Sequence, residues 1–171
     1  MIQIARATVD DAELLAAIAR QSFFESHGHS ASKEIVYAYA DDKFSIDAMH
    51  QELAEPKNIY HIIYFDGQPA GYSKIIFDAA HPNIEAKNVT KLERIYLLKQ
   101  FIEKKLGTQL LQFNIDLSKQ HHQSGIWLFV WKENPRAFSF YQKAGFRVIG
   151  SHDFYLSPTH ANPNHHMLLM Y

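Results

Sequence analysis

The sequence predicts an α/β fold in which a mixed, mostly antiparallel sheet of six to seven strands carries helices on both faces. Short apolar stretches rich in Val, Ile, Phe and Tyr are interspersed with amphipathic stretches of helical period. Two early strands flank a tight turn, which indicates antiparallel pairing, and the later chain alternates strand, helix and strand. No repeat, low-complexity tract or linker interrupts residues 1–171, so we expect a single domain.

The chain opens with a short strand at 2–6, where apolar and polar residues alternate. Thr8 or Asp10 then caps a helix, because the apolar positions within 14–22 recur at helical spacing. Residues 28–44 mix glycine, serine, aromatic and acidic side chains, which indicates a helix–loop region.

A short helix at 46–53 follows a serine cap and ends before Pro56. The apolar, β-branched run at 58–65 is typical of a strand, and Asp66-Gly67 is a strong hairpin-turn signal. We therefore expect 70–77 to pair back as the next strand.

The second half repeats the alternation of apolar runs and amphipathic runs. The expected elements are a strand at 91–98, a helix at 106–117, a strand at 125–131, a helix at 134–144, and strands at 146–156 and 167–171.

Composition excludes several classes of protein. The 171 residues are 47% hydrophobic and 20% charged, with a formal net charge of −1, so no strong field favours nucleic acid or anionic lipid. No apolar run is long enough to span a membrane, and the N-terminus lacks the pattern of a secretory signal. There is no cysteine, which excludes disulfides and thiolate chemistry and suits a cytoplasmic protein.

The most informative stretch runs from Trp131 to Phe146. Asn134 is a good N-cap, Pro135 suits the first helical turn, and Gly145 stands where a helix usually ends in a left-handed residue. Helical spacing places Tyr141 on the apolar face of this short helix.

Six segments occur in a distinctive order: Phe23–Ser26, Ile63–Tyr72, Leu92–Tyr96, Ile126–Asn134, Ala137–Phe146 and Gly150–Tyr155. Together they resemble the Gcn5-related N-acetyltransferase (GNAT) superfamily over essentially the whole chain, and within it the PaiA-like spermidine/spermine N-acetyltransferases. The resemblance implies a GNAT-like fold with acetyl-CoA as co-substrate.

The loop at 102–107, which by the resemblance binds the pyrophosphate of acetyl-CoA, departs from the family pattern. The family window is R/Q-x-x-G-x-G/A before a helix, whereas here Ile102 replaces the Arg/Gln, Lys105 replaces the first glycine, and only Gly107 matches. The donors at a helix N-terminus are backbone amides, so they survive side-chain changes if the loop keeps its conformation. Lysine adopts a positive φ less readily than glycine. The alternative to a CoA-binding loop is therefore a solvated, basic start of a helix.

The resemblance implies a set of residues that bind the cofactor. Within this set, Asn134 can also be a helix cap, and the alternative for Lys143 is a solvated helix lysine. The set comprises Ile95, Tyr96, Leu97, Ile102, Glu103, Lys104, Lys105, Leu106, Gly107, Thr108, Asn134, Ala137 and Lys143.

Two residues are candidates for proton transfer when an amine attacks the thioester directly in a ternary complex. The phenol of Tyr141 is a donor at neutral pH and suits the thiolate leaving group; its alternative is a core tyrosine. Glu93 is the best candidate for a base acting through water, and its alternative is a plain ion pair with a neighbouring Lys or Arg.

The eleven histidines do not form a convincing metal site. The pairs His27/His29, His121/His122 and His165/His166 lack helical i, i+4 spacing or carboxylate partners, so we expect no metal.

The acceptor side is expected in the helical region after the first strand, where an acidic, aromatic-lined groove suits a polyamine. Its candidate residues are Phe24, Glu25, Tyr39, Asp41 and Asp42, and the alternative is a core stripe with a solvated acidic rim.

We therefore expect an acetyl-CoA-dependent N-acetyltransferase that modifies a primary amine, namely a polyamine such as spermidine. The alternatives are an enzyme acting on protein N-termini or another small amine, and a non-catalytic acyl-CoA-binding module. The expected partner is a small-molecule amine, with neither nucleic acid nor membrane, and the expected assembly is a monomer or homodimer.

Overall fold

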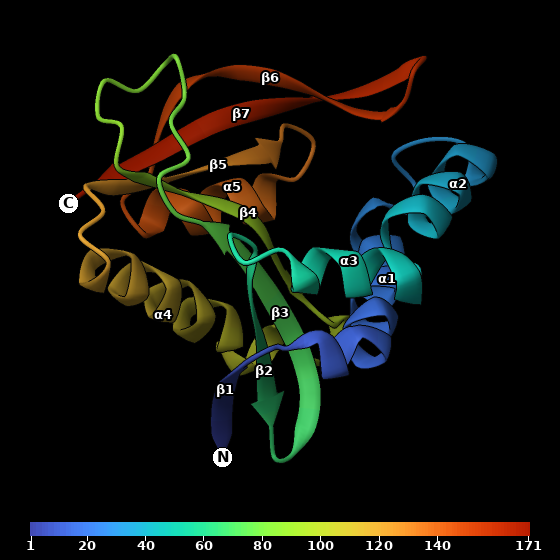
Figure 1. The fold of residues 1–171 in the computed structure, drawn as a ribbon. Helices are drawn as coiled ribbons and strands as arrows, with labels where there is room; N and C mark the ends of the chain where they lie inside the picture. Colours follow the sequence, from blue (N-terminus) through green and yellow to red (C-terminus); the bar gives the residue numbers. More distant parts are fainter. The chain divides into compact units, whose positions relative to one another are not determined.

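A computed structural model describes all 171 residues. Its seven strands form one sheet in the order β1-β2-β3-β4-β5-β7-β6 (Figure 1). The elements are β1 (Ile2–Arg6), a 3-10 turn η1 (Val9–Asp11), α1 (Ala12–His27), α2 (Lys33–Lys43), α3 (Ile46–Ala54), β2 (Ile59–Phe65), β3 (Gln68–Ile76), β4 (Val89–Leu97), a 3-10 helix η2 (Lys99–Lys104), α4 (Leu106–Gln120), β5 (Gly125–Trp131), α5 (Pro135–Lys143), β6 (Arg147–Ser157) and β7 (His160–Met170). The predicted α/β class, with a mixed and mostly antiparallel sheet, is confirmed.

The chain divides into two compact units. The first comprises Met1–Ile75 and Arg94–Asn114, and the second comprises Ile76–Glu93 and Ile115–Tyr171. The divisions fall inside β3, β4 and α4, so each of these elements contributes residues to both units. A single domain over 1–171 stays a prediction.

In the first unit, β1, β2 and β3 pair in antiparallel fashion. The predicted turn at Asp66-Gly67 joins β2 and β3, and both residues have positive φ, 48° and 78°. Two positive φ values in a two-residue loop match the twist of the flanking strands, which is why Asp-Gly is favoured there.

Helices cover both faces of this part of the sheet. Adjacent residues of a strand point to opposite faces. Lys74 donates a hydrogen bond to Glu52 of α3, whereas Ser73 accepts a hydrogen bond from Asn114 of α4. The two helices therefore lie on opposite faces of β3.

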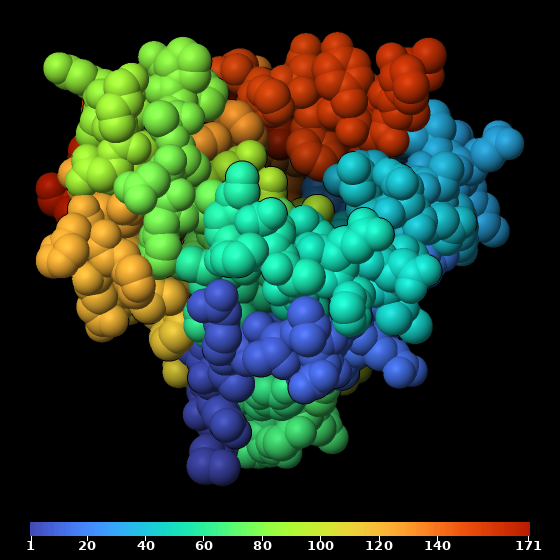
Figure 2. Space-filling view, viewed as in Figure 1, coloured from blue at the N-terminus to red at the C-terminus, as the bar shows by residue number.

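Local signals position α1, α2 and α3. Thr8 and Asp11 form a reciprocal capping box ahead of α1, and Ser32 and Ser45 cap the next two helices through their side chains. The expected helix–loop region contains a complete helix, α2. Residues of α2 and α3, cyan to teal, form a continuous surface in the space-filling view (Figure 2).

In the second unit, Val89, Thr90 and Lys91 of β4 pair in parallel with β5, as the strand–helix–strand order predicts. β7 lies between β5 and β6 and is antiparallel to both, forming a long hairpin with β6 (Figure 1).

The predicted start of the last strand was wrong. β7 begins at His160 rather than residue 167, because the polar run 160–166, which contains Pro163, does not read as a strand. Pairing on both sides nevertheless holds it extended, and the carbonyl of Pro163 accepts a hydrogen bond from the Lys132 N–H.

One face of this unit's sheet is covered by residues 79–86. Ile84 packs with Val89, Trp127 and Leu168, and the Trp127 indole N–H donates to the carbonyl of Ala79 at 2.8 Å. Phe138 of α5 meets His165 of β7. His165 is three positions from Leu168 along the strand and so points to the opposite face, where α5 therefore lies. No helix is long and apolar enough to cross a membrane.

Candidate active site

The loop before α4 adopts the conformation that its family pattern assigns to glycine. Residues Lys99–Lys104 form η2, and Lys105 then takes up a left-handed conformation with φ 59° and ψ 20°, immediately ahead of α4 at Leu106. Lys105 therefore adopts the positive φ although lysine does so less readily than glycine. The buried side chain of Leu106 anchors the first turn of α4 and thereby supports this geometry.

This geometry fits the phosphates of coenzyme A. The first N–H groups of a helix have no intrahelical partner and carry the positive end of the helix dipole. The 15-residue α4 supplies such a terminus, with Gly107 and Thr108 in its first turn. The exposed Lys104 and Lys105 add positive charge beside it. The predicted residues 102–108 are thus together on one short segment.

The C-terminal end of β4 holds Ile95, Tyr96 and Leu97 against β3. A Cβ at Gly71 would lie 2.6 Å from Cδ2 and 3.0 Å from Cα of Leu97, and closer still to the Tyr96 carbonyl. Gly71 thus permits a close backbone approach that any other residue would prevent. The Leu98 N–H donates to the carbonyl of Ala70 at 2.9 Å, which fixes where the strand ends.

Tyr96 points toward the end of α1, where its phenol lies 3.3 Å from Nε2 of His27. Burial raises the pKa of Tyr96, and the nearby Arg94 acts against this rise. Burial, followed by the charge of His29, lowers the pKa of His27 to about 4. Both groups are therefore neutral at pH 7.

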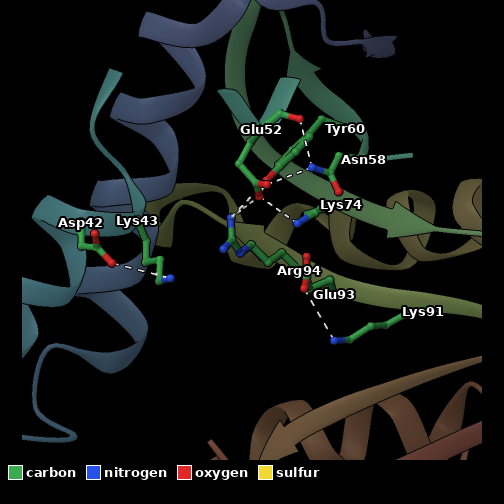
Figure 3. A network of polar contacts seen from close by, with 9 residues as sticks. All are labelled: Asp42, Lys43, Glu52, Asn58, Tyr60, Lys74, Lys91, Glu93 and Arg94. Carbon is green, nitrogen blue, oxygen red and sulfur yellow. Dashed lines mark hydrogen bonds and ion pairs between the residues drawn. The ribbon is translucent and has the colours of Figure 1, made fainter. Parts of the chain in front are cut away.

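A second polar cluster of the first unit surrounds Glu52, which accepts hydrogen bonds from Tyr60 and Lys74 at 2.8 Å and from Asn58 at 2.9 Å (Figure 3). Nη1 of Arg94 lies 3.9 Å from Glu52 Oε1. Burial works to raise the pKa of Glu52, but the bonds from Lys74 and Tyr60 and the charges of Lys74 and Arg94 outweigh it and lower the pKa.

The predicted acceptor residues lie on α1 and α2, and their acids already have partners. Asp41 pairs with Arg20 at 2.8 Å, Asp42 pairs with Lys43 at 3.6 Å, and Glu25 accepts the Lys99 N–H at 3.2 Å.

The predicted aromatic residues pack against different neighbours on the same helices. Phe24 packs against Tyr37 and beneath the guanidinium of Arg20, whereas Tyr39 stacks on the buried ring of Phe23. Ala17, Arg20, Gln21, Phe24 and Glu25 line a shallow, mostly apolar depression of about 450 Å³ along α1.

In the second unit, the Asn134 side chain caps α5 by accepting the Ala137 N–H at 3.1 Å. The capping interpretation of Asn134 is therefore confirmed, while contact with coenzyme A stays a prediction. Lys143 is exposed in the last turn of α5.

Tyr141 is the one buried residue of α5, with 8% of its surface exposed. Its ring meets Phe140 and Phe146 edge-on, and its carbonyl accepts the Phe146 N–H. These contacts fix the ring while leaving a small part of the residue accessible.

Glu93 lies at the end of the second unit's portion of β4, and its Oε1 is 3.6 Å from the ammonium of Lys91 (Figure 3). The ion-pair interpretation is confirmed, and the role of base stays a prediction. No group of three or more His, Cys, Asp or Glu side chains is arranged to hold a metal ion.

Comparison with known proteins decides the family. The model of the acetyltransferase (GNAT) family matches residues 14–146. The chain belongs to this family. It is accordingly an acetyltransferase, with acetyl-CoA as the donor that the loop at 102–108 fits.

Three relatives extend the comparison. An uncharacterized N-acetyltransferase of Lactobacillus delbrueckii subsp. lactis is 30% identical over 91% of this chain and 90% of its own length. A spermidine N(1)-acetyltransferase of Thermoplasma acidophilum is 29% identical over 86% of this chain and 89% of its own length. The crystal structure of the PaiA N-acetyltransferase from Thermoplasma acidophilum, in complex with coenzyme A, superimposes with a TM-score of 0.79 at 23% identity, covering 100% and 99% of the two chains.

Sequence reasoning missed the Glu52 cluster and the surroundings of Lys91. The pairing of Glu52 with Lys74 spans 22 positions, which no local spacing indicates. The signal available for Lys91 was the alternation of Trp127 and Phe129, which places both rings on one face of β5.

Proposed function

We propose that this protein transfers the acetyl group of acetyl-CoA to a primary amine, and that its acceptor is a polyamine such as spermidine. The observation that carries the acetyl-CoA part is the left-handed Lys105 immediately ahead of α4, in a chain of the GNAT family. The polyamine part is supported by the relative from Thermoplasma acidophilum whose name specifies spermidine. In this proposal residues 1–171 act as one cytoplasmic N-acetyltransferase domain, as a monomer or homodimer.

Acetyl-CoA supplies an electrophilic thioester carbonyl. In the proposed arrangement, the amides of 102–108 and Lys104 and Lys105 hold the phosphates, with Asn134, Ala137 and Lys143 contributing to the same ligand. The backbone amides of Ile95–Leu97 polarise the thioester carbonyl. Gly71 supports this role because it lets the end of β4 lie close against β3.

Two side chains move protons. The acceptor reaches the enzyme as an ammonium ion and must lose a proton before its nitrogen can attack, so Glu93 takes that proton through water. As the C–N bond forms and the C–S bond breaks, the Tyr141 phenol donates its proton to the departing sulfur, and the second proton that the nitrogen loses in becoming an amide returns through water to the phenolate.

Glu25, Asp41 and Asp42, with Phe24 and Tyr39, are proposed to attract the distal ammonium groups. Because each acid already has a partner in the free protein, a polyamine exchanges one exposed contact for another. Exposed ion pairs contribute only about 0.2–1 kcal/mol each, so these acids favour encounter more than affinity.

The experiment is an amine panel with acetyl-CoA, followed by release of free thiol. We expect spermidine to have a higher kcat/KM than propylamine or a peptide with a free N-terminus. A higher kcat/KM for the peptide or the monoamine would reject the polyamine assignment and leave the acetyltransferase in place. Binding of coenzyme A without thiol release from any amine would favour the non-catalytic module.

A further inference from the structure

Lys91 occupies an unusual position in the second unit. Its ammonium lies 5.2 Å from the ring centre of Trp127 and 5.6 Å from that of Phe129, on neighbouring strand β5. The same ammonium is 3.6 Å from Oε1 of Glu93. Two aromatic faces and a carboxylate therefore surround one cation, which is the arrangement by which proteins bind ammonium ligands.

The walls of this site are also aromatic. His152 stacks on Phe129 with ring centres 4.0 Å apart, and His81 meets Trp127 at 5.1 Å. His166 is buried beneath them, 4.9 Å from Phe129.

Burial lowers the pKa of His81 and brings that of His166 to about 4, and the charges of neighbouring histidines and Lys91 act in the same direction. These two imidazoles are thus neutral at pH 7 and do not repel a cation.

The resident lysine is partly open to water. The side chains of Lys91 and Glu93 are 24% and 27% exposed, so water reaches both partners of the pair. Lysine is a point charge on a flexible four-carbon stem, and it can leave such a site by rotating its side chain. A ligand that offers the same ammonium group can replace it without disturbing the sheet.

We propose that Trp127, Phe129 and Oε1 of Glu93 form a binding site for a non-reacting ammonium group of the acceptor, that Glu93 acts on the reacting nitrogen only through a water, and that the Lys91 side chain fills this site until the acceptor displaces it. We call these three residues the ammonium cage. The inference rests on the proposed amine acetyltransferase activity and adds where a second charge of a diamine or polyamine binds. Lys91 then acts as an internal competitor that sets the concentration at which polyamines bind.

Removal of the competitor tests this. Lys91→Met keeps the aliphatic stem and removes the ammonium, and we expect the KM for spermidine to fall about three- to tenfold as the binding-competent fraction rises. The KM for propylamine should stay within about twofold, because its only nitrogen must react and cannot also occupy the cage. Lys87→Met, at an exposed lysine of the same unit, is the matched control and should leave both constants unchanged.

A simple change of electrostatic field would give a different pattern. It would lower the KM of spermidine and propylamine together, and salt would erase the gain. Adding Phe129→Leu to Lys91→Met removes one aromatic face at constant charge, so the cage predicts that it reverses most of the gain. Equal gains for both amines, or a gain that survives Phe129→Leu, would overturn the proposal.

Binding without catalysis separates this inference from the proposed function. Hexamethonium has two quaternary ammonium groups and cannot be acetylated, and its titration against the protein without acetyl-CoA can be followed by the fluorescence of the two tryptophans. We expect saturable binding that is tighter in Lys91→Met and weaker in Lys91→Met/Phe129→Leu. That result in a protein that does not acetylate spermidine would keep the cage and remove the acceptor assignment; no saturable binding in folded Lys91→Met would refute the cage.

Discussion

Lys105 precedes α4 in a left-handed conformation, φ 59° and ψ 20°, and this makes Lys105→Gly an informative substitution. A non-glycine residue pays about 1–2 kcal/mol for that backbone region. Glycine avoids this cost but loses more chain entropy on folding, roughly 0.5–1 kcal/mol. We therefore expect Lys105→Gly to stabilise the protein by about 0.5–1 kcal/mol.

The assay is thermal unfolding together with calorimetric titration of coenzyme A. In a chain of this length each kcal/mol shifts the Tm by about 2–4 °C, so Lys105→Gly should raise the Tm by about 1–4 °C. Lys105→Ala keeps the left-handed strain and should leave the Tm nearly unchanged. Both variants lose one exposed charge beside the phosphates, so both should weaken coenzyme A binding by at most about fivefold.

Lys104→Gly is the matched control, because Lys104 is in η2 and has no positive φ. Glycine in an ordinary helical position costs about 0.5–1 kcal/mol, so this variant should lower the Tm. If Lys105→Gly lowers the Tm as Lys104→Gly does, the argument from backbone strain is refuted.

Three further predictions concern the chemistry, the strand end and acid stability. Tyr141→Phe should keep the fold and coenzyme A affinity and lose about 10²–10⁴-fold in kcat, the usual range for one proton-transfer group. Gly71→Ala places a methyl against the backbone of Leu97 and should destabilise the protein by about 1–3 kcal/mol, measured by urea unfolding. His61 and His166 are buried and have pKa values lowered to about 4, in both cases chiefly by burial. Because the unfolded chain binds these protons near pH 6.5, the stabilising effect of each neutral imidazole is present above that pH and is lost as pH falls toward 4, at up to about 1.4 kcal/mol per pH unit for each histidine.

Each of these has a clear contrary result. A Phe variant that retains the parent kcat, with chemistry shown to be rate-limiting, would assign the acid role elsewhere. An unchanged urea midpoint for Gly71→Ala would mean that β4 has room to move. A free energy of unfolding that is flat between pH 7 and pH 4 would mean that the two imidazoles are not held neutral.

Much of the fold could be predicted because its signals are local. Ser45 and Asn134 cap helices in the structure as their sequence positions predict, and Asp66-Gly67 forms the expected turn. The last strand was predicted too short because its first half is polar, and its extended form depends on β5 and β6 pairing on either side.

The candidate site, too, has parts that could be predicted from the sequence and parts that could not. The loop at 102–108 and the helix carrying Tyr141 are contiguous, so they could be found from spacing and family resemblance. The conformation of Lys105 could not, because propensity argues against it and only the surrounding fold imposes it. The partners of Asp41 and Glu25 could not be predicted either, because Arg20 lies 21 positions from Asp41 and Lys99 lies 74 positions from Glu25 in the sequence.

The sequence by itself determined the order of the elements, the positions of their caps and turns, and the family whose chemistry the chain carries, because each depends on residues within a few positions or on a contiguous motif. Only the tertiary structure decided which charges meet. Glu52 finds Lys74 through the packing of α3 on β3, and Lys91 reaches Trp127 through the parallel register of β4 and β5. Register and packing are collective properties of the whole sheet, and a shift of one residue in the strand pairing would turn the side chains of Lys74, Lys91 and Trp127 to the other face.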